Sequence, residues 1–316
     1  MTKKHELIIA NPFHPETIEL LDNLYSTHHL WRLEDPEKAK LIRELEGQCS
    51  AVATASWQCD PAVYALKSLE LIACFGVGVD GIDFEQASRL GAKVSNTPEV
   101  LDAAVADIAL ALILNTTRNI INADAYVRNN DWKKKGPFPF GQGLQGKTLG
   151  IAGLGRIGKA IALRALPFGL KIAYHNRRPV AEPYQYCNSI EELAKESDIL
   201  LCMLPGGAAT KHLINSAVFQ LLGEEGFFIN VGRGSCVDEL ALATALENHV
   251  ICGAGLDVYE REPSVPEALR KQERLVLLPH IGSATVETRR AMGQLVADNL
   301  HSYFNDHSLV SEYDYL

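Results

Sequence analysis

Short apolar stretches alternate with helix-like patterns along the first hundred residues. The apolar stretches have the length of β-strands and lie at 6–10, 29–33, 51–55, 70–75 and 92–96. Between them, residues 15–25 and 36–46 repeat apolar positions at helical spacing. Strands that alternate with helices are typical of a parallel sheet covered by helices on both faces. This part of the chain is therefore predicted to be an α/β domain.

A second series of the same kind follows. A helix between its second and third strands should begin at Ser189, where Ser189 and Glu192 form a capping box. Residues 284–304 read as one long amphipathic helix. The two series together predict an α/β protein with two doubly wound parallel sheets and a cleft between them. The strands of the second series are predicted at 147–153, 171–176, 198–204, 226–232, 251–258 and 275–280.

The segment 97–119 joins the two series and is apolar on nearly every face. It opens with Thr97 and Pro98, which favour the start of a helix. A helix that is hydrophobic all round must be buried on all sides, so a connector packed between two domains is expected. The segment is nearly long enough to span a membrane, but its charged residues favour a helix buried in a soluble protein.

Composition narrows the class of protein. The 316 residues are 47% hydrophobic and 22% charged, which suits two ordered domains. The net charge of −9 gives no reason to expect nucleic acid or an anionic membrane as a partner, and residues 133–135, three lysines, are predicted to be a solvated loop. The seven cysteines form no CxxC pair and lie mostly in strand-like runs. They favour a reducing compartment over a disulfide framework or a metal site. With no apolar leader at the N-terminus, we expect a cytoplasmic protein.

Gly153, Gly155 and Gly158 form a GxGxxG pattern between a predicted strand and a predicted helix. The first glycine permits a tight turn, the second lets the backbone approach a pyrophosphate, and the third allows the helix to pack closely on the strand. The start of the following helix presents N–H groups to the phosphates. In this context the pattern predicts a dinucleotide site.

Asn176, Arg177 and Arg178 occupy the end of the next predicted strand. An acidic residue usually stands there and accepts hydrogen bonds from the ribose hydroxyls of NAD. A ribose 2′-phosphate would be repelled by that carboxylate and needs guanidinium donors instead. The sequence therefore predicts NADP(H) as the cofactor.

Three further polar residues end later strands: Arg233, Glu262 and His280. Because ligands of open α/β sheets bind beyond the carboxyl ends of the strands, these side chains are expected to share one site. An arginine can hold a carboxylate with two hydrogen bonds, a histidine can donate a proton to a carbonyl oxygen, and a nearby carboxylate keeps that histidine protonated. The set suits the reduction of an α-keto acid.

Several motifs in a fixed order resemble one known family, the D-isomer-specific 2-hydroxyacid dehydrogenases, along essentially the whole chain. The resemblance is greatest to the branch of glyoxylate/hydroxypyruvate reductases and hydroxyphenylpyruvate reductases, and "AYHNRRP" (173–179) resembles the members that prefer NADPH. The matching segments are 75–83, 96–112, 146–162, 229–239, 253–267 and 277–289.

The resemblance implies roles for individual residues. Arg233 would bind the substrate carboxylate and polarise the keto group, and His280, paired with Glu262, would be the general acid. The backbone N–H groups of Val77 and Gly78 would also hold the substrate carboxylate. The implied cofactor contacts are Leu154, Gly155, Arg156 and Ile157 at the pyrophosphate, Pro205 and Thr210 at the adenosine, and Val231, Asp257 and Gly282 at the nicotinamide.

The resemblance also implies a discontinuous domain plan. A flavodoxin-like substrate domain would comprise residues 1–99 and 286–316, and a Rossmann cofactor domain residues 100–285. The family's usual homodimer forms through the cofactor domain, and residues 131–146 are expected to take part. No metal ion is implied. The segment 54–61 matches nothing specific, so its Trp57 either shapes substrate specificity or packs.

The expected function is NADPH-dependent reduction of small 2-keto acids, glyoxylate and hydroxypyruvate first. An aryl-pyruvate reductase would use the same chemistry and is the alternative enzyme. A third hypothesis is a nucleotide-sensing scaffold that resembles the C-terminal-binding-protein corepressors, which keep this fold and the catalytic triad. Those proteins favour NAD(H), and residues 176–178 argue against that hypothesis.

Overall fold

The computed structural model describes residues 4–315, which divide into two compact units. The first unit contains the chain up to Leu101 together with the segment from Thr285 onward, and the second is Asp102–Ala284. The boundaries predicted from sequence, 99/100 and 285/286, lie close to these positions. Each unit is described by itself below.

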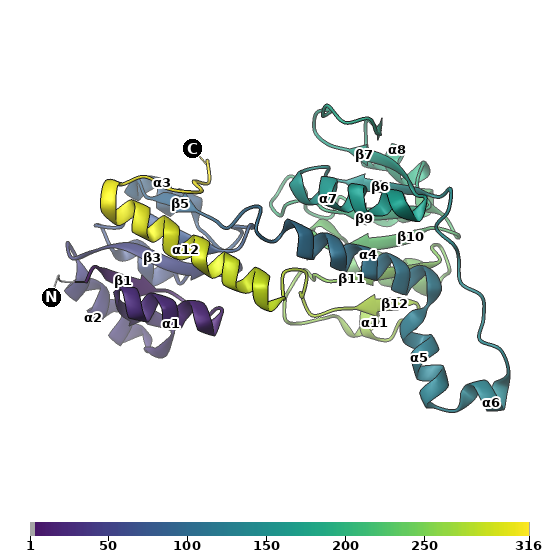
Figure 1. The fold of residues 1–316 in the computed structure, drawn as a ribbon, viewed down its shortest axis with the longest axis horizontal. Coiled ribbons are helices and arrows are strands. Elements are labelled where there is room, and N and C mark those ends of the chain that lie inside the picture. The colour runs from purple at the N-terminus through teal and green to yellow at the C-terminus, as the bar shows by residue number, and fades with distance from the viewer. Residues whose placement is uncertain (1–3, 316) are drawn as a thin grey trace. The chain divides into compact units, whose positions relative to one another are not determined.

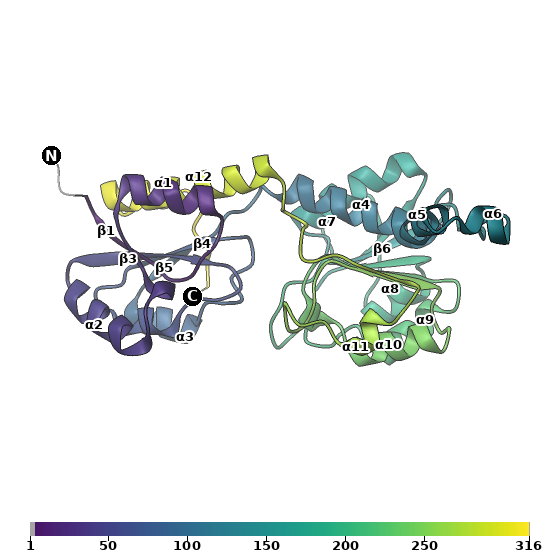
Figure 2. The ribbon, with the colours of Figure 1, turned by 90° about the horizontal axis from the view of Figure 1, so that it is seen from below.

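The first unit is built on a five-stranded sheet whose strands are all parallel. Its order, β2-β1-β3-β4-β5, is the flavodoxin-like one. Figure 2 shows α1 and α12 on one face and α2 and α3 on the other. The elements are β1 (Glu6–Ile9), α1 (Pro15–Leu24), β2 (Ser26–His29), η1 (Leu30–Arg32), α2 (Asp35–Leu45), β3 (Cys49–Ala55), η2 (Pro61–Ala65), β4 (Leu71–Phe75), α3 (Phe84–Leu90), β5 (Lys93–Ser95) and α12 (Val286–Asp306).

One strand of the first unit was predicted in the wrong place. The apolar segment 29–33 is mostly the 3₁₀ helix η1, and the strand before it, β2, is Ser26–His29. These polar residues pair with β1 at the edge of the sheet and are only half-buried. Because an edge strand needs less apolar surface than a central one, its sequence carries little of the hydrophobic signal.

The second unit is built on a seven-stranded parallel sheet with the order β12-β11-β10-β9-β6-β7-β8. This is the Rossmann order extended by one strand, so the predicted fold class of two doubly wound parallel sheets is confirmed. The two-residue strand β8 was not predicted. The strands are β6 (Thr148–Ala152), β7 (Lys171–His175), β8 (Gln185–Tyr186), β9 (Ile199–Cys202), β10 (Phe227–Asn230), β11 (Gly253–Leu256) and β12 (Leu275–Leu277).

Helices cover both faces of this second sheet, with α4 and α7 on one face and α8, α9, α10 and α11 on the other (Figure 2). A large apolar core lies beneath the second group. The helices are α4 (Asp102–Arg118), α5 (Ile120–Arg128), α6 (Asp131–Lys135), α7 (Arg156–Ala165), η3 (Leu166–Phe168), α8 (Ile190–Lys195), α9 (Ser216–Leu222), η4 (Gly234–Cys236), α10 (Glu239–Glu247) and α11 (Glu267–Arg270).

The helix α4 differs from its prediction in two ways. It begins at Asp102 rather than at Thr97, because Thr97 exchanges hydrogen bonds with Gly76 and Glu99 adopts a left-handed backbone conformation with φ 70°. It is not buried on all sides: Asp107 is exposed and forms an ion pair with Arg164 of α7 at 2.7 Å. α4 is thus a surface helix of the second sheet.

The predictions for the capping box, the three lysines and the cysteines can be compared with the structure. The Ser189 hydroxyl does accept the N–H of Glu192, but the Glu192 carboxylate accepts from Asn188 instead of Ser189, so half of the capping box is present. The three lysines at 133–135 are exposed but belong to α6 rather than to a loop. All seven cysteines are free thiols and six of them are buried, as expected for core residues.

Within residues 4–315, no single helix is both long enough and apolar enough to cross a membrane. Only α4 and α5 taken together, bent by 61° at their junction, reach that length and composition.

Candidate active site

The glycine-rich loop lies between β6 and α7, and its backbone geometry explains why two of its glycines lack a side chain. A Cβ on Gly153 (φ 102°) would lie 2.6 Å from the carbonyl oxygen of Met203, and one on Gly158 would lie 2.3 Å from that of Gly153. A Cβ on Gly155 would meet no atom within 4 Å. Gly155 is also the N-cap of α7 and gives it no side-chain cap. The backbone there is open to a pyrophosphate, which the N-terminus of α7 would favour.

The backbone N–H groups of the predicted pyrophosphate residues differ in whether they already have a partner within the chain. The N–H of buried Leu154 donates to the side-chain oxygen of Asn176 at 2.7 Å, so it is engaged within the chain. Arg156 and Ile157 are the first residues of α7, where backbone N–H groups lack partners inside the helix. The Arg156 guanidinium lies 3.7 Å from the carboxylate of Asp102.

The end of β7 is tied to the glycine-rich loop. The Asn176 amide accepts from the N–H of Leu154 and lies 3.4 Å from its carbonyl oxygen, and the Tyr186 hydroxyl donates to the Asn176 carbonyl. Arg177 and Arg178 are exposed, and neither has an ion-pair or hydrogen-bond partner within residues 4–315. Two exposed arginines thus directly follow Asn176, the residue that bonds to the predicted pyrophosphate loop. Their guanidinium groups suit a phosphate monoester.

The loop after β9 lies at the same edge of the sheet, because β9 is the neighbour of β6 on the other side of the switch point. It contains the predicted adenosine contacts. The Thr210 hydroxyl donates to the carbonyl of Pro205 at 2.7 Å and closes the loop into a compact turn. The Cys236 thiol also contacts the Pro205 carbonyl, which connects this loop to the one that carries Arg233.

The Arg233 loop follows β10 and is rigidly held. The fully buried Asn230 accepts from the N–H of Gly232 at 3.1 Å and donates to the carbonyl of Arg233 at 3.0 Å. Gly232 fits only because it lacks a side chain: a Cβ there would lie 2.8 Å from the Leu204 carbonyl. Val231, the predicted nicotinamide contact, is buried at the start of this loop.

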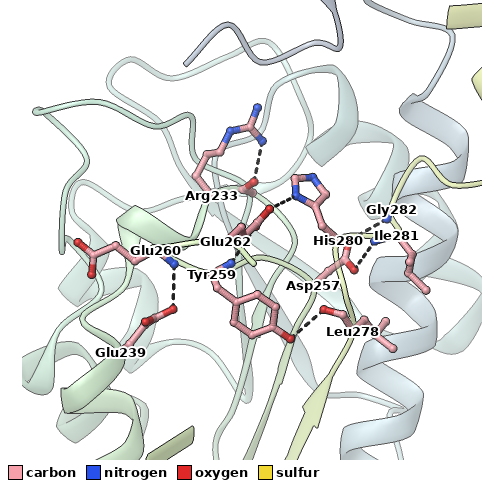
Figure 3. A network of polar contacts seen from close by, with 11 residues as sticks. Arg233, Glu239, Asp257, Tyr259, Glu260, Glu262, Leu278, His280, Ile281 and Gly282 are labelled. Carbon is pink, nitrogen blue, oxygen red and sulfur yellow. Dashed lines mark hydrogen bonds and ion pairs between the residues drawn. The ribbon is translucent and has the colours of Figure 1, made fainter. Parts of the chain in front are cut away.

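Glu262 and His280 form a hydrogen-bonded pair (Figure 3). The distance from His280 Nδ1 to Glu262 Oε2 is 2.6 Å, and the other oxygen of Glu262 accepts the N–H of Tyr259 at 3.0 Å. Burial raises the pKa of Glu262, but the bond and charge of His280, the Tyr259 N–H and the charge of Arg233 outweigh it and hold the pKa below its usual value. The His280 side chain is 43% exposed.

Asp257 holds the loop that carries His280. Its two carboxylate oxygens accept the N–H groups of Ile281 and Gly282 at 2.7 and 2.8 Å, and its carbonyl accepts that of His280 at 2.9 Å. His280 has φ 53°, a conformation rare outside glycine that this clamp stabilises. Burial raises the pKa of Asp257, and the two N–H groups oppose that rise. The predicted contact of Asp257 with nicotinamide stays a prediction, beside this observed structural role.

The three predicted catalytic residues therefore lie at one edge of one sheet, since Arg233, Glu262 and His280 follow the neighbouring strands β10, β11 and β12. Within residues 4–315, no three His, Cys, Asp or Glu side chains gather into a group that could hold a metal ion.

Val77 and Gly78 belong to the first unit, in the loop after β4. The loop is fixed by Asn96, whose amide donates to the Val77 carbonyl at 2.9 Å. No acceptor among the described residues takes the N–H of Val77 or Gly78, so both are available to an anion. Trp57 lies in the adjacent segment, where a Cβ on Gly81 would be 2.5 Å from the Trp57 carbonyl carbon, and its side chain is 57% exposed. Trp57 does not pack into the core.

Sequence reasoning missed three residues that shape the site. Asn230, Glu239 and Tyr259 are buried, and all three bond to the loops that carry Arg233 and Glu262. Polar residues inside otherwise apolar stretches were the available signal, because a buried polar group must find a partner. The partner itself is visible only in the fold.

The comparisons with known proteins agree with this geometry. The family model "D-isomer specific 2-hydroxyacid dehydrogenase, NAD binding domain" matches residues 110–282. Hydroxyphenylpyruvate reductase of Plectranthus scutellarioides is 44% identical over 87% of this chain and 86% of its own length. Glyoxylate/hydroxypyruvate reductase A of Arabidopsis thaliana is 42% identical over 92% of this chain and 93% of its own.

A solved structure is similarly close. The NADPH-dependent glyoxylate/hydroxypyruvate reductase from Sinorhizobium meliloti, in complex with NADP and malonate, superposes with a TM-score of 0.92 at 40% identity and covers 98% of this chain and 97% of that one. The resemblance inferred from the motifs is confirmed. The chain belongs to the D-isomer-specific 2-hydroxyacid dehydrogenase family.

Proposed function

We propose that this protein reduces small 2-keto acids, glyoxylate and hydroxypyruvate, to 2-hydroxy acids with NADPH. The observation that carries the proposal is the 2.6 Å pair of His280 and Glu262, with Arg233 at the same edge of a Rossmann sheet. Such a reduction needs a general acid that protonates the keto oxygen, a cation that binds the substrate carboxylate, and a loop that binds the dinucleotide. The relatives named above support the substrate class.

Arg233 and His280 have different roles in the proposed reaction. Arg233 binds the substrate carboxylate and places positive charge near the keto oxygen, where negative charge develops. Bound NADPH supplies the hydride that the keto carbon accepts. His280 donates the proton from Nε2 to the keto oxygen, because Nδ1 is held by Glu262. The C=O group thereby becomes CH–OH, and solvent reprotonates the imidazole before the next turnover.

Glu262 holds the ring of His280 through its carboxylate. The pKa of Glu262 lies below the usual value, so the carboxylate is charged throughout the neutral range. This carboxylate lies 2.6 Å from Nδ1, so Nε2 is the ring nitrogen that faces the proposed proton transfer. Glu262 also orients the ring, since it is itself fixed by the N–H of Tyr259.

The proposed cofactor preference rests on Arg177 and Arg178, which are exposed and free of ion-pair partners in the described chain. If the Arg177 guanidinium binds the 2′-phosphate, Arg177→Ala should raise KM for NADPH about tenfold to a hundredfold, the worth of one charge-assisted contact. KM for NADH should barely change, because NADH has no 2′-phosphate. Steady-state kinetics with both cofactors measures this.

Arg270→Ala is the matched control, since Arg270 is an exposed arginine of the same unit, on α11. It should leave both KM values unchanged. Added salt should weaken NADPH binding more than NADH binding, because the additional contact is ionic and exposed. An Arg177→Ala variant whose KM for NADPH equals that of the parent would refute the assignment.

Aryl-pyruvates are the second candidate substrates, because a hydroxyphenylpyruvate reductase is 44% identical to this chain. Trp57 stands exposed beside the Val77–Gly78 loop, where an aromatic side chain can either narrow a substrate pocket or stack on an aryl group. Comparing kcat/KM for phenylpyruvate with that for hydroxypyruvate separates the two classes. A higher value for phenylpyruvate would replace the favoured substrates by aryl ones.

We further propose that the protein is a homodimer formed through the second unit. In Figure 1, α5 and α6 project away from the body of that unit. Exposed apolar side chains gather on them and on the segment that follows, and a monomer seldom exposes so many together. Sedimentation equilibrium that gave the monomer mass at micromolar concentration would contradict the proposal. The residues concerned are Ile120, Ile121, Val127, Trp132 and Phe140.

A further inference from the structure

Glu239 is a buried carboxylate close to the proposed acid pair. It is the first residue of α10 and only 8% exposed. One of its oxygens accepts the backbone N–H of Glu260 at 2.9 Å (Figure 3). Glu260 stands two residues before Glu262 in the same turn, so Glu239 holds the backbone from which Glu262 projects.

The turn is held at two further points. A Cβ on Gly234 would lie 1.8 Å from the carbonyl carbon of Tyr259 and 2.3 Å from the nitrogen of Glu260, so this peptide sits directly on the Arg233 loop. The Tyr259 hydroxyl donates to the Leu278 carbonyl at 2.8 Å, two residues before His280. The turn therefore contacts the loops of Arg233 and His280 as well as Glu239.

Glu239 is buried, unlike a surface carboxylate that water solvates, and its burial is energetically unfavourable. Burial raises its pKa, the N–H of Glu260 opposes the rise, and the nearby charge of the Glu260 carboxylate adds to it. The Glu260 carboxylate is bound by His212 at 3.1 Å. Burying a carboxylate costs free energy unless hydrogen bonds satisfy it. One carboxylate oxygen of Glu239 accepts a single hydrogen bond, from the backbone N–H of Glu260 in the turn that carries Glu262.

We propose that Glu239 is a positioning residue for the proposed reduction: by holding the N–H of Glu260, it fixes Glu262 at hydrogen-bonding distance from His280. The inference rests on the proposed function. It predicts that loss of the acceptor separates Glu262 from His280 without disturbing the glycine-rich loop or residues 176–178, which lie on other strands.

The test compares three variants of the full-length protein. Glu239→Ala should lower kcat about tenfold to a hundredfold, the effect of a displaced catalytic group, with KM for NADPH unchanged. The alkaline limb of its pH–kcat profile should move to lower pH, because the imidazolium loses its carboxylate partner. Glu239→Gln keeps an oxygen acceptor and should recover most of kcat. Glu262→Gln removes the charge directly and should move the limb furthest.

Glu247→Ala is the matched control, an exposed glutamate at the other end of α10, and should behave as the parent. If Glu239→Ala does not fold, Glu239→Asp shortens the side chain by one methylene and should show the same shift in smaller degree. A second readout uses the protein without cofactor: the NMR resonances of the His280 ring should differ from those of the parent in the Glu239→Ala variant, because the 2.6 Å bond from Nδ1 to Glu262 is weakened.

The outcomes separate the two claims. A parent protein with no 2-keto acid reductase activity would refute the proposed function. An active parent whose Glu239→Ala variant loses kcat in proportion to unfolded protein, with the alkaline limb and the His280 ring resonances unmoved, would refute the positioning role alone. An active Glu239→Ala variant with parental kinetics would do the same.

Discussion

Replacing His280 by alanine is expected to lower kcat for reduction of glyoxylate or hydroxypyruvate by about 10²–10⁴, the usual contribution of a general acid. The reason is that Nε2 of this ring is the proposed proton donor, fixed by the 2.6 Å bond between Nδ1 and Glu262. Cofactor affinity should change little, because the glycine-rich loop and Arg177 lie on other strands. Single-turnover kinetics with NADPH, together with titration of NADPH binding, measures both effects.

His249→Ala provides the control, since His249 is an exposed histidine in the same unit and is not part of the proposed site. It should keep parental turnover. Near-normal kcat in His280→Ala would show that the acid is another group or a water molecule.

Replacing Arg233 by alanine should impair both binding and turnover, with a loss of kcat/KM of about 10²–10³. The guanidinium is proposed to anchor the substrate carboxylate and to stabilise charge on the keto oxygen, so both contributions vanish together. Its loop is held by Asn230 and Gly232 through backbone contacts, so the variant should keep the loop intact. Initial rates over a range of 2-keto acid concentrations give kcat and KM separately.

Arg233→Lys is the informative companion. An ammonium restores the charge but not the two parallel hydrogen bonds of a guanidinium, so only part of the activity should return. Equal kcat/KM in Arg233→Ala and the parent would mean that a different residue holds the substrate.

Much of the fold was predictable because buried parallel strands are apolar along their length. The stretches that became β1, β3, β4 and the strands of the second unit except β8 stand out for that reason. The edge strands β5 and β12 were also predicted, but the edge strands β2 and β8 were not. β2 is polar and half-buried, and β8 has two residues, so neither carries a hydrophobic pattern. The start of α4 was misplaced because Thr97 is held by Gly76, a tertiary contact that overrides its local preference for a helix start.

Part of the candidate site was also predictable from the strand pattern. Arg233, Glu262 and His280 follow β10, β11 and β12. They were located by the strand pattern together with the rule that ligands bind at the carboxyl edge of the sheet. The pairing of Glu262 with His280 was implied by the family resemblance, and the structure places the two atoms 2.6 Å apart. Glu239 was missed because the N–H that it accepts, that of Glu260, is distant in sequence. Asn230 bonds to backbone groups only two and three residues away, but those bonds depend on the shape of the loop after β10, which the sequence pattern does not show. The clamp role of Asp257 also depends on a loop that only the folded chain shows.

The Rossmann unit, with Arg177 and Arg178 on one strand end and the His280–Glu262 pair on others, is proposed to use NADPH to reduce a small 2-keto acid. The most direct measurement is kcat/KM of the parent protein for glyoxylate and hydroxypyruvate with NADPH and with NADH at the same ionic strength. We expect turnover of both substrates and a kcat/KM at least about tenfold higher with NADPH, the contribution of one charge-assisted contact. No turnover with either cofactor, or an equal or higher value with NADH, would contradict this proposal.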